Sequence, residues 1–175
     1  MPAMIEADLT TGFRRAMRRL AATVTIISTA DRRGTRHGMT ATAVSSVSAD
    51  PPSLLVCVNT AASPHDPLLT RGRFCVNVLT TGHEALVSAF AGYLAGEDRF
   101  AVGDWREDDD GVPYLHGAQC NVFCTVDTVV PFGSHSVVIG RVDAVRVADA
   151  VAPLIYADGT LWSAQPLGAA RLPED

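Results

Sequence analysis

The sequence predicts a mainly β fold, a barrel of short strands with short flanking helices. Apolar, β-branched runs bounded by turn residues recur along the chain, whereas only two or three segments show helical periodicity. No internal repeat, linker or low-complexity segment divides the 175 residues, so we predict a single domain over 1–175. We expect its core at about 10–165 and a C-terminal tail at 166–175.

The first third of the chain predicts one helix followed by strands. Four apolar residues share one helical face within the first 20 residues: Phe13, Ala16, Met17 and Leu20. Arginines fill the opposite face, which favours a solvated helix surface over a phosphate site, and Thr10 or Thr11 can cap the helix start. Apolar or β-branched runs then predict three strands: 23–27, 37–48 and 53–59.

The remainder of the chain alternates short helices with strands. Ser63 is a good N-cap and Pro64 suits the first helical position, so a short helix is predicted there. A second helix is expected at 83–93, and a polar loop at 97–112. The expected strands are 73–79, 120–130, 137–147 and a final hairpin around Asp158-Gly159.

The composition excludes several functions. The net charge is −5, whereas nucleic-acid binding needs basic patches that neutralise phosphates. All 14 basic residues are Arg, so the chain offers no P-loop lysine and no Schiff-base lysine. No apolar run approaches the ~20 residues that cross a bilayer, and the N-terminus is unlike a signal peptide. We therefore expect a cytoplasmic protein with reduced cysteines, no membrane contact and no nucleic-acid partner.

The sequence lacks the common metal, hydrolase and dinucleotide motifs. His116, Cys120 and Cys124 have ligand spacing for a helix, but their segment is strand-like and there is no C-x-x-C pair, so we expect no metal site. Cys57 and Cys75 lie in apolar strands, where a free cysteine behaves as a small hydrophobe. There is no G-x-S-x-G elbow and no G-x-G-x-x-G loop.

Three polar stretches remain, and each has a functional and a plain structural interpretation. Small and hydroxylated residues dominate 38–52. They would let a flat ligand approach the backbone closely, or they belong to an ordinary edge strand. Asn59 ends a strand shortly before Ser63-Pro64, where a helix start can offer N–H groups to an anion or simply be capped. His135 lies in a turn between two long strands. A histidine there can exchange protons near neutral pH, or it can have a purely structural role.

Together these stretches belong to an ordered set of motifs that resembles the flavin reductase-like family, the small NAD(P)H:flavin oxidoreductases of two-component flavin-dependent monooxygenases. The resemblance covers residues 10–165, and its specificity lies in the order of the motifs rather than in any single one. The matching segments are 38–42, 46–48 with 50–52, 55–59, 74–79, 90–92, 99–100, 133–135 and 153–156.

The resemblance implies a Greek-key, FMN-binding split barrel that forms a homodimer, with flavin near the dimer interface. It also implies hydride transfer from NADH or NADPH to FMN, or FAD, and a partner monooxygenase that receives the reduced flavin. His135 matches the position beside the nicotinamide and is the expected catalytic residue. The expected cofactor-binding residues are Met39, Thr40, Ala41 and Thr42 along the isoalloxazine, Cys57, Val58 and Asn59 at its polar edge, Ser46, Ser63 and Arg99 near the ribityl phosphate, and Phe90, Ala91 and Gly92 closing the pocket.

Two departures from the family pattern bear on this expectation. Ser134 stands where the family usually has Asp, which affects how His135 is oriented or charged. Pro64 and His65 replace smaller polar residues of the family. Two other functions fit the same resemblance, namely a split barrel with tightly bound FMN that reduces an organic substrate directly, and a non-catalytic flavin- or haem-binding module. Turnover of NAD(P)H with added flavin separates them.

Overall fold

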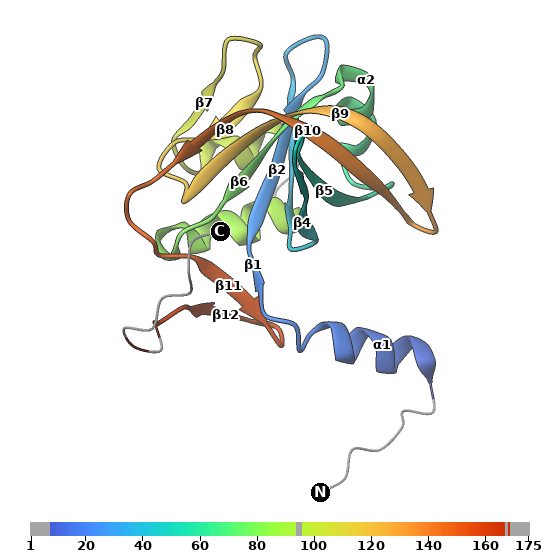
Figure 1. Ribbon diagram of the computed structural model, residues 1–175, viewed down its shortest axis with the longest axis vertical. Coiled ribbons are helices and arrows are strands. Elements are labelled where there is room, and N and C mark those ends of the chain that lie inside the picture. The colour runs from blue at the N-terminus through green and yellow to red at the C-terminus, as the bar shows by residue number, and fades with distance from the viewer. Residues whose placement is uncertain (1–7, 94–95, 167, 169–175) are drawn as a thin grey trace, which may run out of the picture.

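The computed structural model describes residues 8–93, 96–166 and 168, and most of the tail predicted at 166–175 lies outside these residues (Figure 1). Its main body is one antiparallel sheet in the order β3-β2-β6-β9-β10-β5-β4. The predicted mainly β fold is therefore confirmed. The strands are β2 Thr25–Ala30, β3 Arg36–Ala41, β4 Val44–Ala49, β5 Pro52–Asn59, β6 Arg73–Val78, β9 Cys120–Phe132 and β10 His135–Val147.

The two edges of this sheet are brought together by a very short connection. β3 and β4 form opposite edges of the sheet, yet only Thr42 and Ala43 separate them in the chain. Three peptide links span at most ~11 Å, so the sheet must curl until its edges lie close together. The prediction of one strand over 37–48 is therefore wrong, because the chain passes there from one edge of the barrel to the other.

The strand order contains a Greek key. β5 and β6 are joined through the short helix α2, His65–Arg71, but the hairpin of β9 and β10 lies between them in the sheet. The two long strands at the predicted positions are confirmed. Their register shifts between Ile139 and Gly140 and again between Val142 and Ala144, and such irregularities bend a long hairpin.

A smaller sheet lies below the barrel in the view of Figure 1 and has the order β1-β11-β12. It joins β1, Ala22–Thr23, to the hairpin of β11, Leu154–Ala157, and β12, Thr160–Ser163. Asp158 and Gly159 have φ values of 50° and 84°, the left-handed conformation that a tight two-residue hairpin turn requires. The predicted final hairpin is confirmed.

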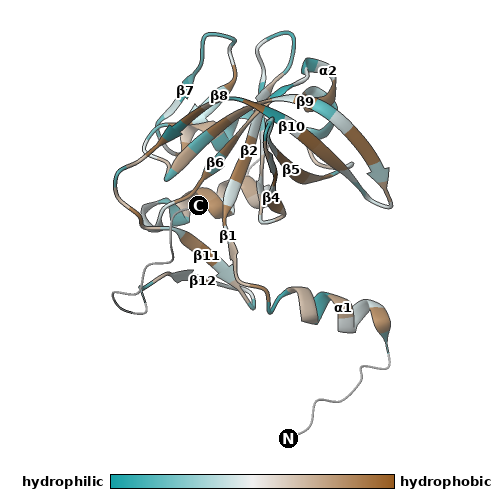
Figure 2. Cartoon of the chain, viewed as in Figure 1, coloured by the Kyte–Doolittle hydropathy of each residue, from teal (hydrophilic) through white to brown (hydrophobic). Residues whose placement is uncertain are grey.

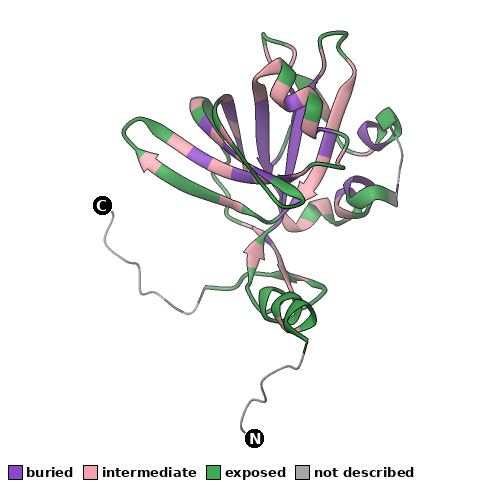
Figure 3. Cartoon of the chain, turned by 90° about the vertical axis from the view of Figure 1, so that its right-hand side faces the viewer, coloured by how far each residue is buried: buried purple, intermediate pink, exposed green. Residues whose placement is uncertain are grey.

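The N-terminal helix α1, Leu9–Met17, stands away from the barrel (Figures 1 and 3). Its N-cap is Asp8, whose carboxylate accepts the N–H groups of Thr10 and Thr11 at 3.2 and 3.0 Å. The prediction of a threonine cap is wrong, because the preceding carboxylate already satisfies those two N–H groups. The predicted apolar face exists but is uncovered in the single chain, with Phe13 59% exposed.

The helix predicted at 83–93 is a composite. It consists of the 3₁₀ turn η1, Thr81–His83, the α-helix α3, Glu84–Ser88, and the π turn η2, Ala89–Tyr93. Gly92 interrupts it with a φ of 102°. Among the described residues, no helix is both long and apolar enough to cross a bilayer.

The polar loop predicted at 97–112 is wrong in part, because two of its aromatic rings are needed in the core. The segment contains the 3₁₀ helix η3, Gly96–Ala101, and strand β7, Trp105–Glu107, which pairs with β8, Pro113–Leu115. The ring centroids of Phe100 and Trp105 lie 4.9 Å apart. Burying these aromatic rings stabilises a segment whose remaining residues are polar.

The apolar interior has two main clusters, which appear as the buried and hydrophobic stretches of the strands in Figures 2 and 3. The first surrounds Phe74 inside the barrel and includes Ile27 and Val58, all fully buried. The second contains Phe90 and Leu86 and packs the η2 and η3 segments against the barrel. The second cluster positions the wall of the site described below.

One polar side chain, Asn77, is completely buried among the strands. Its amide nitrogen donates to Ile26 O at 2.9 Å and to Ser28 Oγ at 2.8 Å. Its Oδ1 accepts from Leu115 N at 2.8 Å and from Asn121 Nδ2 at 2.9 Å. The network joins β2, β6, β8 and β9, so the cost of burying the amide is offset inside the protein.

Candidate functional site

A cavity of about 470 Å³ opens between β3, the turn after β5 and the η2–η3 segments. Eight of the predicted cofactor-binding residues are among those that line it. The lining residues are Gly38, Met39, Thr40, Asn59, Ala61, Ala62, Ser63, Phe90, Ala91, Gly92 and Arg99. Gly38, Ala61 and Ala62 were missed as site residues, although Gly38 opens one of the quoted motifs.

Arg99 supplies the positive charge of this cavity. The residue is only 8% exposed, and its Nη1 donates to Gly38 O at 2.6 Å and to Ser63 Oγ at 3.3 Å. Its guanidinium carbon also lies 5.9 Å from the centroid of the Phe90 ring. These contacts hold a permanent cation against the cavity wall, where it can meet an anionic group such as a phosphate.

Ser63 has a different local role from the one predicted. The N-cap of α2 is Pro64, and no side chain caps the helix. The Ser63 hydroxyl instead accepts a hydrogen bond from Arg99, which lies 36 residues later in the chain. The prediction of Ser63 as N-cap is therefore wrong, because a distant guanidinium binds its hydroxyl.

A glycine allows β3 to pack closely against the aromatic wall. A Cβ at Gly38 would lie 2.8 Å from Cε1 of Phe90 and 3.2 Å from the carbonyl oxygen of Ile27. The Phe90 ring itself packs edge-on against Phe100, with centroids 5.0 Å apart. The absence of a side chain at position 38 thus sets where Phe90 lies and how wide the cavity is.

A second cavity of about 350 Å³ adjoins the first and shares Thr40 and Ala91 with it. Ala41 and Thr42, both predicted site residues, line this second cavity. Its other lining residues are Val24, Val87 and Tyr156. Together the two cavities form an elongated site, the groove, with a charged polar end at Arg99 and a more apolar end at Tyr156.

Three predicted residues lie outside the set that lines the groove. Val58 is fully buried in the barrel core, and Ser46 is exposed on β4. Cys57 is partly buried, and its N–H donates to Ala43 O at 3.1 Å. A role through the backbone, as predicted for Cys57 and Val58, stays a prediction.

His135 begins β10 and lies directly opposite Asn59 of β5, a residue that lines the first cavity. Its imidazole is exposed, and Nδ1 lies 2.9 Å from Ser134 Oγ. Thr60 N donates to Ser134 O at 3.0 Å, which ties the histidine's turn to the turn after β5. The hydroxyl of Ser134 therefore orients the ring at the position where a carboxylate was expected.

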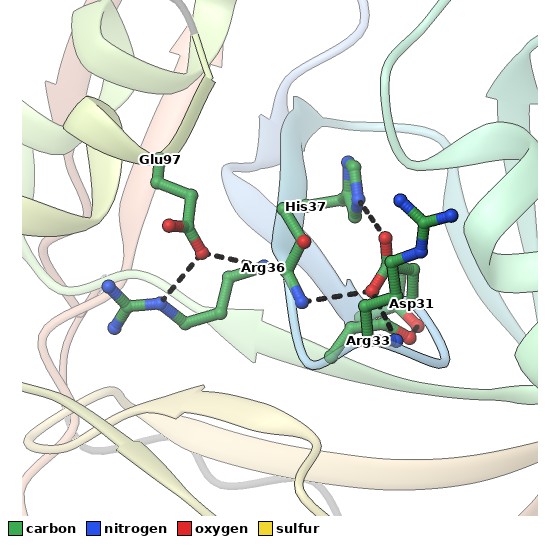
Figure 4. Close-up of polar contacts among 8 residues, drawn as sticks. Asp31, Arg33, Arg36, His37 and Glu97 are labelled. Atoms are coloured by element: carbon green, nitrogen blue, oxygen red, sulfur yellow. Dashed lines mark hydrogen bonds and ion pairs between the residues drawn. The ribbon is translucent and has the colours of Figure 1, made fainter.

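Polar contacts that the sequence did not predict hold the first residues of β3, Arg36 and His37 (Figure 4). Asp31 accepts the N–H of Arg33 at 2.8 Å, and its Oδ2 lies 3.7 Å from His37 Nε2. Glu97 of η3 accepts the N–H of Arg36 at 3.0 Å. The turn at 31–34 was readable from local residues, whereas Glu97 is 61 positions from its partner and gave no local signal.

The four cysteines are free, and Cys75 and Cys124 are buried. Burial raises the pKa of Cys120, and it raises that of Cys124 to about 12, so both thiols stay protonated at neutral pH. Within the described ranges, no group of three or more His, Cys, Asp or Glu residues has the arrangement needed to hold a metal ion.

Comparison with known proteins identifies the fold and the family. The family model of the flavin reductase like domain matches residues 17–164. The reductase component of the FADH(2)-dependent resorcinol hydroxylase of Rhizobium sp. (strain MTP-10005) is 45% identical over 159 residues, which are 89% of this chain and 88% of that protein. The FMN reductase (NADH) RutF of Methylorubrum populi is 43% identical over 146 residues, 83% of this chain and 72% of its own.

A solved structure agrees with the sequence relatives. The NADH:FAD oxidoreductase SgcE6 of Streptomyces globisporus C-1027 superposes with a TM-score of 0.86 at 26% identity, covering 95% of this chain and 99% of that one. The fold is thus the split barrel of the flavin-reducing oxidoreductases. The chain belongs to the flavin reductase like family, and the resemblance carried by its motifs is confirmed.

Proposed function

We propose that this flavin reductase binds FMN or FAD along the groove, with the phosphate toward Arg99, and reduces it with NADH or NADPH beside His135. The observation that carries the proposal is the position of Arg99. A nearly buried guanidinium, bonded to Ser63 Oγ and Gly38 O, lies at one end of a groove whose other end, beside Val24, Val87 and Tyr156, is apolar. This pairing of a cationic end with an apolar end suits a ligand that carries both a phosphate and a flat ring.

The residues fit a flavin chemically. Arg99 and Ser63 provide a charged and a neutral polar partner for phosphate oxygens. Phe90, Ala41 and Tyr156 provide apolar surface for the isoalloxazine and its methyl groups. FMN and FAD share these parts, so the proposal applies to either flavin.

The protein's chemical task is small in this reaction. Bound flavin accepts a hydride from the nicotinamide, so no protein nucleophile is needed. The chain must hold the two rings together and exclude water, which the walls at Phe90 and Asn59 support. A Ser134 hydroxyl that donates to Nδ1 of His135 leaves Nε2–H to donate, for example to the nicotinamide carboxamide.

The relatives support the cofactors and the partner. The Rhizobium protein is the reductase component of an FADH(2)-dependent hydroxylase, and the two other named relatives are an FMN reductase (NADH) and an NADH:FAD oxidoreductase. We infer that this chain, too, oxidises NADH, reduces FMN or FAD, and passes reduced flavin to a separate monooxygenase component in the cytoplasm. The four free cysteines agree with a reducing compartment.

We further propose that the protein is a homodimer. α1 presents an apolar face to solvent in the single chain, with Leu9, Phe13 and Met17 exposed by 84%, 59% and 45%. Several large apolar side chains exposed on one helix face are typical of a protein contact. Light scattering should give twice the mass of the chain, and a monomer at working concentration would refute the proposal.

The decisive experiment follows the absorbance of NADH with purified protein and added FMN, FAD or riboflavin. Saturable oxidation that depends on added flavin is expected. His135→Ala should lower kcat/KM for NADH at least about tenfold while changing the Kd for flavin less than about threefold. Equal loss of both would make His135 structural. Flavin binding without NADH or NADPH oxidation would instead support a direct FMN-dependent enzyme or a binding module.

A further inference from the structure

The side chains of Asp66, His65 and Ser136 form a hydrogen-bonded line that crosses from α2 to β10. Nδ1 of His65 lies 2.7 Å from Oδ1 of Asp66, and its Nε2 lies 3.0 Å from Oγ of Ser136. The His65 side chain is 12% exposed, and Ser136 is 2% exposed. Neither residue was singled out as a site residue by the sequence motifs, and the flavin groove does not account for the line.

The order Asp–His–Ser resembles the arrangement that activates a serine nucleophile. Ser136 cannot act in this way, because it lies within β10, opposite Val58, and is almost completely buried. A substrate carbonyl could not reach its hydroxyl. The line therefore holds parts of the structure together rather than performing a second reaction.

The geometry sets a direction for the hydrogen bonds. A carboxylate at Nδ1 favours the tautomer in which Nδ1 carries the proton, so Nε2 can accept from the buried hydroxyl of Ser136. The Asp66 side chain is 90% exposed, and solvent screens its charge. Asp66 thus orients the ring, while the bond between His65 and Ser136 is the connection that matters structurally.

This connection joins the two halves of the proposed reaction site. His65 is the first residue of α2 and comes two positions after Ser63, which lines the groove and binds Arg99. Ser136 directly follows His135 in β10. The bond between them therefore fixes the flavin-binding turn against the strand end that carries His135.

We propose that His65 is a positioning residue for hydride transfer, which acts through Ser136 to hold His135 in register with the flavin groove. The inference rests on the function proposed above. A side chain too short to cross from α2 to β10 could not make this bond.

The test uses the full-length protein and three variants. His65→Leu removes the connection and keeps an apolar side chain in its place. Ser136→Ala removes only the hydroxyl, and is the milder variant if His65→Leu unfolds. Thr29→Val is the matched control, because it removes a different buried hydroxyl, which donates to Arg73 O at 2.7 Å. The measurements are the Kd for FMN, the kinetic constants for NADH, and the unfolding midpoint in urea.

Both His65→Leu and Ser136→Ala should lower kcat/KM for NADH about tenfold, with the Kd for FMN changed less than about threefold. Thr29→Val should lower the urea midpoint similarly but leave kcat/KM for NADH within about twofold. In a His135→Ala background, His65→Leu should cost less than about twofold, because the two residues act in one unit. Additive losses, or losses no larger than those of Thr29→Val, would overturn the proposal.

A measurement without turnover completes the test. In flavin-free protein, His65→Leu should shift the imidazole NMR signals of His135 and speed amide hydrogen exchange at 135–137, whereas Thr29→Val should leave both unchanged. Unchanged His135 signals in His65→Leu would refute the positioning role even if activity fell. If His135→Ala itself leaves NADH turnover intact, the proposed function of His135 fails first, and the role of His65 fails with it.

Discussion

Asn77 and Arg99 are both buried polar side chains, but they lie in different surroundings. Asn77 of β6 is fully buried between strands, and its hydrogen bonds to Ile26, Ser28, Leu115 and Asn121 reach β2, β8 and β9. Arg99 is 8% exposed at the wall of a cavity of about 470 Å³. The first arrangement specifies how the strands pack. The second presents a fixed charge to a space that a ligand can fill.

In this small barrel, different buried polar side chains serve stability and binding. A fully satisfied interior network stabilises the folded protein, but its donors and acceptors are not free to bind a ligand. A guanidinium held by Gly38 O and Ser63 Oγ contributes less to strand packing, but it is positioned before any ligand arrives. Substitutions in the two regions should therefore change different measurable quantities.

The largest effect is expected for Asn77→Ala. The change leaves the N–H of Leu115 and the amide of Asn121 without their buried acceptor, and it opens a small cavity. We expect a loss of about 3–5 kcal/mol in the free energy of unfolding. Urea denaturation measures this value. A loss below about 1 kcal/mol would mean that Asn77 does not hold the strands together.

A pair of glycines gives a smaller and more direct contrast. A Cβ at Gly140 would lie 2.6 Å from Cζ of the fully buried Phe74, whereas a Cβ at Gly38 would lie 2.8 Å from Cε1 of Phe90, at the cavity wall. Gly140→Ala should cost about 2–3 kcal/mol, because the core ring has no space to move.

Gly38→Ala should cost about 1 kcal/mol but should weaken FMN binding several-fold, since the added methyl group displaces the Phe90 ring that lines the groove. Urea unfolding and FMN titration of both variants separate the two effects. A larger loss of FMN affinity in Gly140→Ala than in Gly38→Ala would contradict the assignment of Gly140 to the core and Gly38 to the binding site.

The smallest effect concerns His83, which ends η1 in the helical segment that leads to Phe90. Burial holds the pKa of His83 below its ordinary value of 6.5, and its Nδ1 accepts the N–H of Thr80 at 3.2 Å. The unfolded chain therefore takes up the proton first, so this histidine lowers stability as the pH falls below about 6.5. The loss stops once the pH is below the folded pKa.

His83→Gln should flatten this part of the stability–pH curve. Urea midpoints measured between pH 5 and 8 for the variant and for the wild-type protein give the difference directly. An identical slope in both proteins would show that other groups cause the acid sensitivity.

Local sequence signals predicted the elements whose causes are local. The hairpin at Asp158-Gly159 and the long strands β9 and β10 follow from turn residues and apolar runs. The ordered motifs indicated the family and most of the groove. Ala41 and Thr42 were expected in the same pocket as Met39, but they line the adjoining cavity, beside Tyr156 of the small sheet.

The errors come from contacts between residues far apart in the chain. Ser63 is a good cap by type, but Arg99 binds its hydroxyl from 36 positions away. The loop predicted at 97–112 is partly ordered because Phe100 packs against Phe90. The break at Thr42 and Ala43 follows from closure of the barrel, which no local propensity encodes.

The most direct test of the account compares FMN with riboflavin, which lacks the phosphate, on Arg99→Ala. Fluorescence titration of both flavins against wild-type and variant protein gives four dissociation constants. The account predicts that the variant binds FMN at least about tenfold more weakly and riboflavin less than about threefold more weakly. Equal weakening of the two flavins, or unchanged FMN binding in a folded variant, would contradict a phosphate site at Arg99.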